Sequence, residues 1–458
     1  MSFRLESDSI GEKEINSNAY YGVQTLRAVE NFPITGQKVH PEFINSLAAI
    51  KKAAAIINCK VGVLNKNISE AISISCDEIL NGKLHDQFIT DPIQGGAGTS
   101  FNMNANEVIA NRAIELLNGE KGNYSIVHPN DHVNMAQSTN DVIPTAGKLT
   151  TIKLLKKAIL ELERLYVALE EKEKEFHNII KMGRTQMQDA IPIRLGQEFG
   201  AYKATVKRDL KRLNMAIEEL SSVNLGGTAI GTSLNANKDY VKKIVPELSS
   251  IVKLNLKQAE DLVDSTQNLD GFVFVSSILK TCVVSLSKMS NDLRIMSSGP
   301  RTGFSEINLP PKQNGSSIMP GKVNPVIPEV MSQVAFNIIG NDTTITLAAE
   351  AGQLELNAFE PVIFFKLFES ITTLTNGVKT FIDNCISGIT ANKERCFSLV
   401  DQSVGIITAI CPILGYQASA EIAKAAIKTG KSVRCLLKEK HNLTDEEIDK
   451  ILDPKTMV

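Results

Sequence analysis

Residues 152–176 read IKLLKKAILELERLYVALEEKEKEF, and this stretch decides the fold class. Its apolar residues recur at steps of three and four, with Lys and Glu between them: Ile152, Leu155, Ile159, Leu162, Tyr166 and Leu169, followed seven residues later by Phe176. A stripe with this period predicts an amphipathic α-helix of about thirty residues, which follows Pro144. At 1.5 Å per residue such a helix is a rod of about 45 Å, which needs neighbours along its whole length.

Four further long helices are predicted. Pro192 is expected to open the second long helix, which carries an apolar stripe at the same spacing: Phe199, Tyr202, Val206, Leu213, Ile217 and Leu220. Three more segments have a helical pattern but are less polar on every face: 265–297, 325–350 and 360–388. Rods of this length must lie side by side, so we predict an all-α fold built on a long helix bundle. Several helices are too apolar for one bundle in water, which predicts an oligomer whose subunits pack bundle against bundle.

The sequence suggests three regions. Residues 1–139 contain shorter helical pieces and turn-rich loops, and predict a mostly helical N-terminal domain. Residues 140–393 hold the long helices of the central bundle, and residues 394–458 predict a small C-terminal helical domain.

Bulk composition is that of a soluble protein. The chain has 458 residues, of which 43% are hydrophobic and 22% charged, and its formal net charge is -2. This charge gives no electrostatic reason for binding nucleic acid or an anionic membrane surface. The N-terminal residues contain acids and no apolar core segment, and we find no run of about eighteen apolar residues. We therefore expect a cytoplasmic protein with neither a nucleic-acid partner nor a membrane partner.

Cysteine and histidine patterns argue against disulfides and metal sites. The seven cysteines are an odd number without short paired spacing, so we expect reduced and mostly buried thiols. The six histidines form no HExxH pattern. His128 and His132 are four apart, but Pro129 and Asn130 between them predict a loop, which makes metal binding there unfavourable.

Two polar segments precede predicted helices. Gly95–Ser100 has three glycines, which let a backbone approach a ligand closely, and Asn102, Asn104 and Asn106 follow. A simple glycine-rich turn with a polar helix cap explains the same residues. Gln137–Asp141 is rich in the residues that cap helix N-termini, and such an end also attracts anions, so the two interpretations are compatible.

Two more polar segments lie between long helices. Gly183–Asp189 reads GRTQMQD and concentrates hydrogen-bond donors where a plain helix-to-helix turn would suffice, although an exposed polar loop is an equal alternative. Residues 315–325 read GSSIMPGKVNP, where two glycines permit movement and two prolines stiffen the moving part. This segment is neither a G-x-S-x-G elbow nor an S-x-x-K motif.

The four segments share one chemical inventory. They supply hydroxyls, amides, backbone N–H groups and one lysine, but almost no acids apart from Asp141 and Asp189. Such donors suit a small dianionic substrate that is held at both carboxylates. They do not suit metal-assisted chemistry, which requires His or acidic ligands, so we expect no metal or other cofactor.

At residues 315–325 the chain resembles the fumarase/aspartase superfamily. The segments GGAGTSFNMNANEV, HPNDHVNMAQSTND and GRTQMQDA support this resemblance, which runs from about residue 5 to the C-terminus. Within the superfamily the chain is more similar to the aspartase branch, through NAYYGVQTLRA, QSTND, AEDLVDST and GNDTTITLAAEAGQLELN. The resemblance implies elimination of ammonia from L-aspartate to give fumarate. A class II fumarase, acting on malate, and a non-catalytic structural protein on the same fold are the alternatives.

The family resemblance also implies an assembly and a set of site residues. It implies three helical domains, a homotetramer with a shared central bundle, and active sites built from three chains. It assigns the general base to Ser316. It assigns substrate binding to Thr99, Ser138, Thr139, Asn140, Thr185, Ser317, Lys322 and Asn324, with Gln186 as a further candidate. Many family members have His at the position of Gln186, and an amide there positions a ligand but does not titrate.

Overall fold

The computed structural model describes residues 2–441 and 443–453. The chain divides into two compact units, which we describe separately. The first comprises Met1–Ile159, Lys211–Thr281 and Phe336–Leu374, and the second comprises Leu160–Leu210, Cys282–Ala335 and Thr375–Val458. The proposed starts of the second and third regions, residues 140 and 394, fall within one residue of a helix start. The three-domain division itself stays a prediction.

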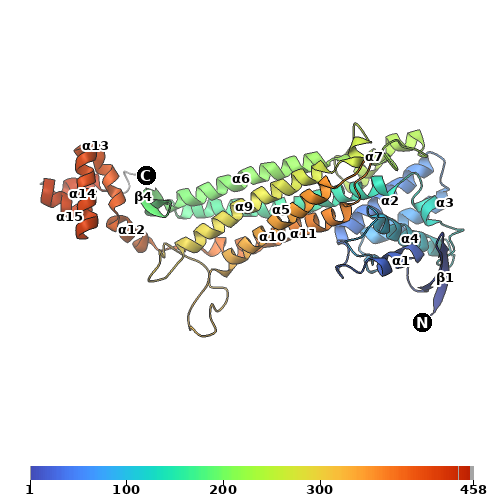
Figure 1. Cartoon of the computed structure of the whole chain (residues 1–458), viewed down its shortest axis with the longest axis horizontal. Helices are drawn as coiled ribbons and strands as arrows, with labels where there is room; N and C mark the ends of the chain where they lie inside the picture. The colour runs from blue at the N-terminus through green and yellow to red at the C-terminus, as the bar shows by residue number, and fades with distance from the viewer. Residues whose placement is uncertain (1, 442, 454–458) are drawn as a thin grey trace. The chain divides into compact units, whose positions relative to one another are not determined.

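Five long helices dominate both units and confirm the predicted all-α fold. They are α5 (Thr139–Glu175), α6 (Leu195–Leu220), α9 (Asp270–Met296), α10 (Val326–Glu350) and α11 (Glu360–Asn384). Each contributes residues to both units, and within each unit their segments run side by side (Figure 1). The predicted apolar stripes form the helix contacts, because Leu155, Leu162, Leu213 and Leu220 are all fully buried.

Aromatic and polar contacts fix the neighbours within each unit. In the first unit the rings of Phe272 on α9 and Phe364 on α11 lie 5.1 Å apart, edge to face. In the second unit Phe176, just after α5, meets Phe199 of α6 with ring centroids 5.2 Å apart. The hydroxyl of Tyr202 also donates to a carboxylate oxygen of Asp292 at 2.9 Å.

A proline lies inside α5, although the sequence predicted that this helix would follow it. Pro144 has no N–H, so the carbonyl oxygen of Asn140, four residues earlier, has no partner within the helix. Asn224 replaces the missing donor, because its Nδ2 lies 3.0 Å from that oxygen. Asn224 is itself fully buried and also donates to Thr266 Oγ1 at 3.0 Å. The helix therefore continues through Pro144 with this carbonyl satisfied.

The remaining helices and strands are shorter than these five helices. In the first unit they are β1 (Phe3–Asp8), β2 (Gly11–Asn16), α1 (Val23–Asn31), α2 (Pro41–Lys60), α3 (Lys66–Leu80), η1 (His85–Gln87), α4 (Thr99–Leu116), η2 (Pro129–Val133), β5 (Ser222–Val223), α7 (Lys238–Val252), β6 (Lys257–Gln258) and α8 (Asp264–Gln267). In the second unit they are β3 (Ile180–Thr185), β4 (Gln188–Arg194), β7 (Ile307–Asn308), η3 (Ile386–Gly388), β8 (Thr390–Ala391), α12 (Lys393–Gln402), η4 (Val404–Ile410), α13 (Cys411–Leu414), α14 (Tyr416–Thr429), α15 (Val433–His441) and α16 (Asp445–Ile451). Strands in the described ranges form only two-stranded sheets.

Two local predictions were wrong. Pro192 does not open the second long helix but lies in β4 opposite Met182, and α6 begins at Leu195. A two-stranded ribbon tolerates proline, because one side of each strand has no ladder to complete. The segment after His128 is not a loop but the π-helical turn η2, since proline is well suited to the first position of a helix. The Nδ1 atoms of His128 and His132 both accept backbone N–H groups of this turn.

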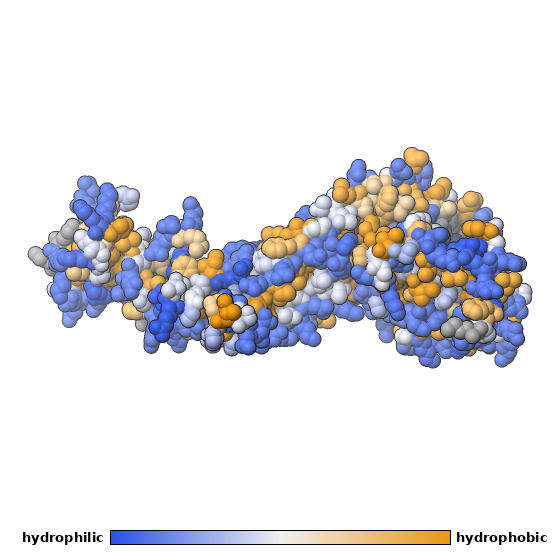
Figure 2. All heavy atoms as spheres, turned by 60° about the horizontal axis from the view of Figure 1, so that its bottom comes forward, coloured by the Kyte–Doolittle hydropathy of each residue, from blue (hydrophilic) through white to orange (hydrophobic). Residues whose placement is uncertain are grey.

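Apolar residues reach the surface of the long helices. Examples are Leu160 on α5, Phe336 and Leu347 on α10, and Val284 on α9, all more than half exposed. Figure 2 shows hydrophobic residues gathered in patches on the face that it presents. By length and composition alone α9 could cross a membrane, but 56% of its most apolar window is buried, and core helices of soluble proteins meet the same criterion. The cysteines are free thiols, as predicted, and four of the seven are buried.

Candidate active site

The first unit brings four of the predicted site residues onto the N-termini of two neighbouring helices. Thr99 is the first residue of α4, and Thr139 is the first residue of α5. Gly98 precedes α4 with φ 83°, and a Cβ on it would lie 2.8 Å from Ile143 of α5, so only glycine fits there. The close contact sets the two helix starts beside each other. Helix N-termini offer free N–H groups and a favourable dipole to an anion.

Thr99 uses its side chain locally in this structure. Its hydroxyl donates to the carbonyl oxygen of Gly96 at 2.7 Å, across the glycine-rich turn. The side chain is exposed. A substrate carboxylate can therefore accept the Thr99 hydroxyl proton only if the bond to Gly96 breaks.

Ser138 is the N-cap of α5, which confirms the capping interpretation of residues 137–141. Its Oγ accepts the backbone N–H of Asn140 at 3.1 Å, and its own N–H donates to Asp141 at 2.9 Å. Asp141 is fully buried and also accepts the N–H groups of Gly226 and Thr228. Burial raises the pKa of Asp141 to about 6. This acid fixes the start of α5 from beneath and is not available to a substrate.

Asn140 is tied to a loop of the same unit. Its side-chain Nδ2 donates to the carbonyl oxygen of Ala229 at 2.7 Å. The Oδ1 atom stays available as an acceptor, which is the atom that an ammonium group requires. The arrangement suits the predicted role of Asn140 toward a substrate amino group.

A buried lysine lies beneath these residues and was not predicted as part of the site. The Nζ atom of Lys51 on α2 donates to Asn102 at 2.6 Å, to Asn134 at 2.8 Å and to Gln137 at 3.0 Å. Lys51 is fully buried, and this burial lowers its pKa to about 7, while the charge of Asp141 acts in the opposite direction. Its signal in the sequence is a charge inside the otherwise apolar helix SLAAIKKAAAII.

In the second unit, Thr185 and Gln186 belong to the β3–β4 hairpin. Thr185 pairs with Gln188, so Gln186 and Met187 alone form the turn, with φ 55° and 63°. Two-residue turns of this kind favour Asn and Gly, because side chains with Cβ atoms are strained at positive φ. Both turn residues are exposed at the end of the ribbon.

In the loop of residues 315–325, two backbone N–H groups donate to the side chain of Ser316, which is half-buried. The Oγ atom of Ser316 accepts the N–H groups of Ile318 at 3.2 Å and Met319 at 3.0 Å. Hydrogen bonds donated to an oxygen favour its ionised form. The loop is closed at its base, because the N–H of Gly315 donates to the carbonyl oxygen of Lys322 at 2.8 Å.

Two other residues of this loop differ in availability. The Nδ2 atom of Asn324 donates to the carbonyl oxygen of Gly315 at 2.7 Å, so this amide holds the loop closed. Lys322 and Ser317 are exposed. No carboxylate of residues 2–441 or 443–453 lies within ion-pair distance of Lys322. Its charge is therefore available to a substrate carboxylate.

The candidate residues thus divide between the units. Thr99, Ser138, Thr139 and Asn140 come together in the first unit, and the remaining candidates lie on two segments of the second unit: Thr185, Gln186, Ser316, Ser317, Lys322 and Asn324. Across the described part of the chain, no hydrogen bond links the hairpin turn to the loop of residues 315–325. The same part of the chain contains no group of three or more metal-ligating side chains.

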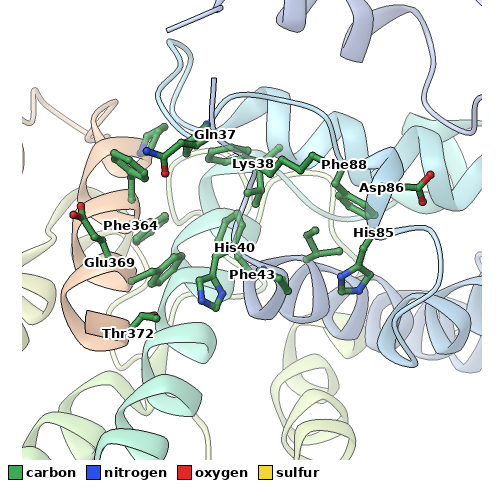
Figure 3. A pocket seen from close by; sticks show the side chains of 18 of the residues that line it. Gln37, Lys38, His40, Phe43, His85, Asp86, Phe88, Phe364, Glu369 and Thr372 are labelled. Atoms are coloured by element: carbon green, nitrogen blue, oxygen red, sulfur yellow. The ribbon is translucent and has the colours of Figure 1, made fainter. Parts of the chain in front are cut away.

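A separate cavity in the first unit has a different character. It has a volume of about 530 Å³ and lies beside α2 and α11. Figure 3 shows Phe43, Phe88 and Phe364 among its aromatic lining, with His40 and His85 also facing it. None of the predicted site residues lines this cavity. Its apolar walls do not match a dianionic substrate.

The fold is a framework of long helices that carries donor-rich segments at helix starts and in loops. A family model described as "Lyase" matches residues 11–340, and one described as "Fumarase C C-terminus" matches residues 406–458. The chain belongs to the fumarase/aspartase superfamily of lyases.

Relatives and solved structures match the whole chain. "Aspartate ammonia-lyase" of Bacillus subtilis is 55% identical over 99% of this chain and 96% of that protein. The crystal structure of "fumarate lyase:delta crystallin" from Brucella melitensis bound to cobalt has a TM-score of 0.97 at 48% identity, covering 100% of this chain and 99% of that one. The class II fumarase of Schistosoma mansoni has a TM-score of 0.96 at 35% identity, with the same coverage.

Proposed function

We propose that this chain is a carbon–nitrogen lyase that reversibly eliminates ammonia from L-aspartate to give fumarate. The observation that carries this proposal is the full-length identity of 55% with a protein named aspartate ammonia-lyase. Identity with the class II fumarase is only 35% over the same length. The donor-rich, acid-poor segments fit a substrate with two carboxylates.

Ser316 is the proposed general base. In the reaction its alkoxide removes a proton from C3 of aspartate, and the electron pair moves into the β-carboxylate to form an aci-carboxylate. The pair then returns to form the C2–C3 double bond while the C2–N bond breaks and ammonia leaves. The two N–H groups on the Ser316 oxygen support this role, since they stabilise the alkoxide.

The other candidates hold the two carboxylates. Donors on the β-carboxylate stabilise the charge that develops there more than they stabilise the ground state, which is the source of catalysis. We assign this task to Thr99, Ser138, Thr139 and Ser317. We assign the α-carboxylate to Thr185, Lys322 and Asn324, and the amino group to Asn140. Gln186 is a further candidate for positioning the substrate. To bind the α-carboxylate, the Asn324 amide would have to break its hydrogen bond to the carbonyl oxygen of Gly315. Substrate binding would therefore include a rearrangement of the loop.

We further propose a cytoplasmic homotetramer with active sites shared between subunits. The exposed apolar residues of α9 and α10 support an oligomer, because exposing large apolar side chains to water costs free energy that burial in a subunit interface would recover. The distribution of the candidates over several segments of both units supports a shared site. Light scattering after gel filtration tests the assembly, and a stable monomer would contradict it.

Purified protein mixed separately with L-aspartate and L-malate tests the activity, with fumarate followed by its ultraviolet absorbance. We expect fumarate from aspartate, whereas fumarate from malate alone would indicate a fumarase. The Ser316→Ala variant should fold and assemble like the parent but lose activity by about 10²–10⁴-fold, as is typical for a general base. Activity above about a tenth of the parent would exclude Ser316 from this role.

A further inference from the structure

The amide groups around Lys51 form a hydrogen-bonded network in which each donor nitrogen has at least one acceptor. The ammonium group of Lys51 donates to three side-chain oxygens, one each on Asn102, Asn134 and Gln137. Because an ammonium group has three donors and no acceptor, these three amides must turn their oxygens toward it. Their NH₂ groups consequently point away from the lysine.

Those NH₂ groups also have fixed acceptors. The Nδ2 atom of Asn134 donates to the carbonyl oxygen of Gln137, and the Nε2 atom of Gln137 donates to two backbone carbonyl oxygens. The Nδ2 atom of Asn102 donates to Asn134 Oδ1 at 3.1 Å and to Thr139 Oγ1 at 3.4 Å. The bond to Thr139 is the route by which the network reaches a candidate site residue.

The direction of this bond matters for Thr139. Its hydroxyl oxygen accepts from Asn102, so its single proton remains to be donated elsewhere. Within residues 2–441 and 443–453 no group accepts a hydrogen bond from this hydroxyl, and the side chain is only half-buried. Asn102 and Lys51, in contrast, are 2% and 0% exposed, so water does not compete for the hydrogen bonds that set the direction of the network.

We propose that Asn102, held by Lys51, is a positioning residue that aims the hydroxyl proton of Thr139 at the β-carboxylate of the substrate. The inference rests on the proposed function. In this proposal the buried lysine fixes the orientation of the three amide groups, which a hydrophobic residue of equal size could not do. Asn102 itself does not touch the substrate and acts only through Thr139.

Asn102→Asp reverses the bond with almost no change of shape. The new carboxylate keeps its contact with Lys51 as an ion pair but has no N–H to donate, so the Thr139 proton turns toward it. Losing one aimed donor typically lowers kcat by about 10²–10³-fold. We expect a loss of about 100-fold in kcat with L-aspartate and a smaller change in KM, since the bond strengthens in the transition state.

A double-mutant cycle separates this mechanism from a general effect of the new charge. With Thr139→Val the hydroxyl is absent, so adding Asn102→Asp should lower kcat by less than about threefold. With Thr139→Ser, the matched control, the hydroxyl is kept and the loss from Asn102→Asp should return. Circular dichroism and the thermal midpoint show whether each variant is folded. If Asn102→Asp does not fold, Asn102→Leu enters the same cycle, because it also removes the donor to Thr139.

Three outcomes would overturn the proposal. The first is an equal loss from Asn102→Asp with Thr139 present and with Thr139→Val, because Asn102 would then act by another route. The second is an unchanged kcat for Thr139→Val alone. In both cases the parent still converts L-aspartate, so the proposed function stands. The third outcome, a folded parent without activity on L-aspartate, removes the proposed function together with the inference that rests on it.

Discussion

Replacing Asn224 by leucine should destabilise the start of α5, because this amide substitutes for the donor that Pro144 lacks. The change removes the bonds from Asn224 Nδ2 to the Asn140 carbonyl oxygen and to Thr266 Oγ1, each 3.0 Å long, and the longer bond of 3.4 Å that Thr145 Oγ1 donates to Asn224 Oδ1. Leucine has nearly the shape of asparagine, so no cavity opens and water does not enter in its place.

The magnitude follows mainly from the two shorter bonds, since the 3.4 Å bond from Thr145 contributes less. A net contribution of about 1 kcal/mol per hydrogen bond gives about 2 kcal/mol, and a buried carbonyl without a partner adds about 1–2 kcal/mol. We therefore expect Asn224→Leu to lower the free energy of unfolding by about 3–4 kcal/mol. Urea denaturation at matched protein concentration measures this difference, since the stability of an oligomer depends on concentration.

Pro144→Ala provides the decisive comparison. Alanine restores an N–H at residue 144, which can donate to the Asn140 carbonyl oxygen when Asn224 is replaced. The double variant should therefore recover about 1–2 kcal/mol relative to Asn224→Leu alone. In the parent, the carbonyl is already satisfied and Pro144→Ala should gain little by this route. Strict additivity of the two changes would refute the assignment of Asn224 as the replacement donor.

Three further predictions concern a helix cap, a helix contact and the substrate lysine. The Nδ1 atom of His40 caps α2, and burial lowers the pKa of this histidine. The cap therefore stabilises the folded chain above pH 6.5, and this stabilisation is lost as the pH falls through the lowered folded-state pKa. His40→Asn, which caps at any pH, should remove about 1 kcal/mol of this acid sensitivity in urea titrations at pH 8 and pH 5, and an unchanged difference would contradict the cap. Gly147→Ala would drive its Cβ into the Phe364 ring and should cost about 1–3 kcal/mol, whereas Gly271→Ala, which meets neighbours at 3.6 Å, should cost far less; equal midpoints would contradict this contact. Lys322→Ala should raise KM for L-aspartate by about tenfold or more, since it removes a charged donor, and an unchanged KM would remove it from the α-carboxylate.

The sequence was most informative where one periodic signal repeats. Leu155 and Leu162 belong to a stripe long enough for its spacing to exclude other structures, and the corresponding helix is present. Its start was misplaced because Pro144 usually interrupts a helix, and the compensating Asn224 lies 84 residues from Asn140 in the sequence. Local patterns do not reveal compensation over such a distance.

Among the candidate site residues, the segments were easier to find than their surroundings. Ser316 and Thr139 lie in polar segments that stand out between apolar helices. Lys51 did not stand out, because its three partners are 51, 83 and 86 residues away and the network exists only after folding. The hairpin at Gln186 was also missed, since its turn lacks the Asn-Gly pair that normally marks one.

That turn illustrates a trade between stability and activity. Asn at position 186 and Gly at position 187 would relieve the positive φ angles of 55° and 63° and make the hairpin more stable. A selection for thermal resistance alone should therefore favour that pair, whereas a selection for turnover should keep Gln186 if its amide serves the substrate. Natural chains that carry larger side chains at such a turn accept local strain in exchange for a fixed direction of the side chain.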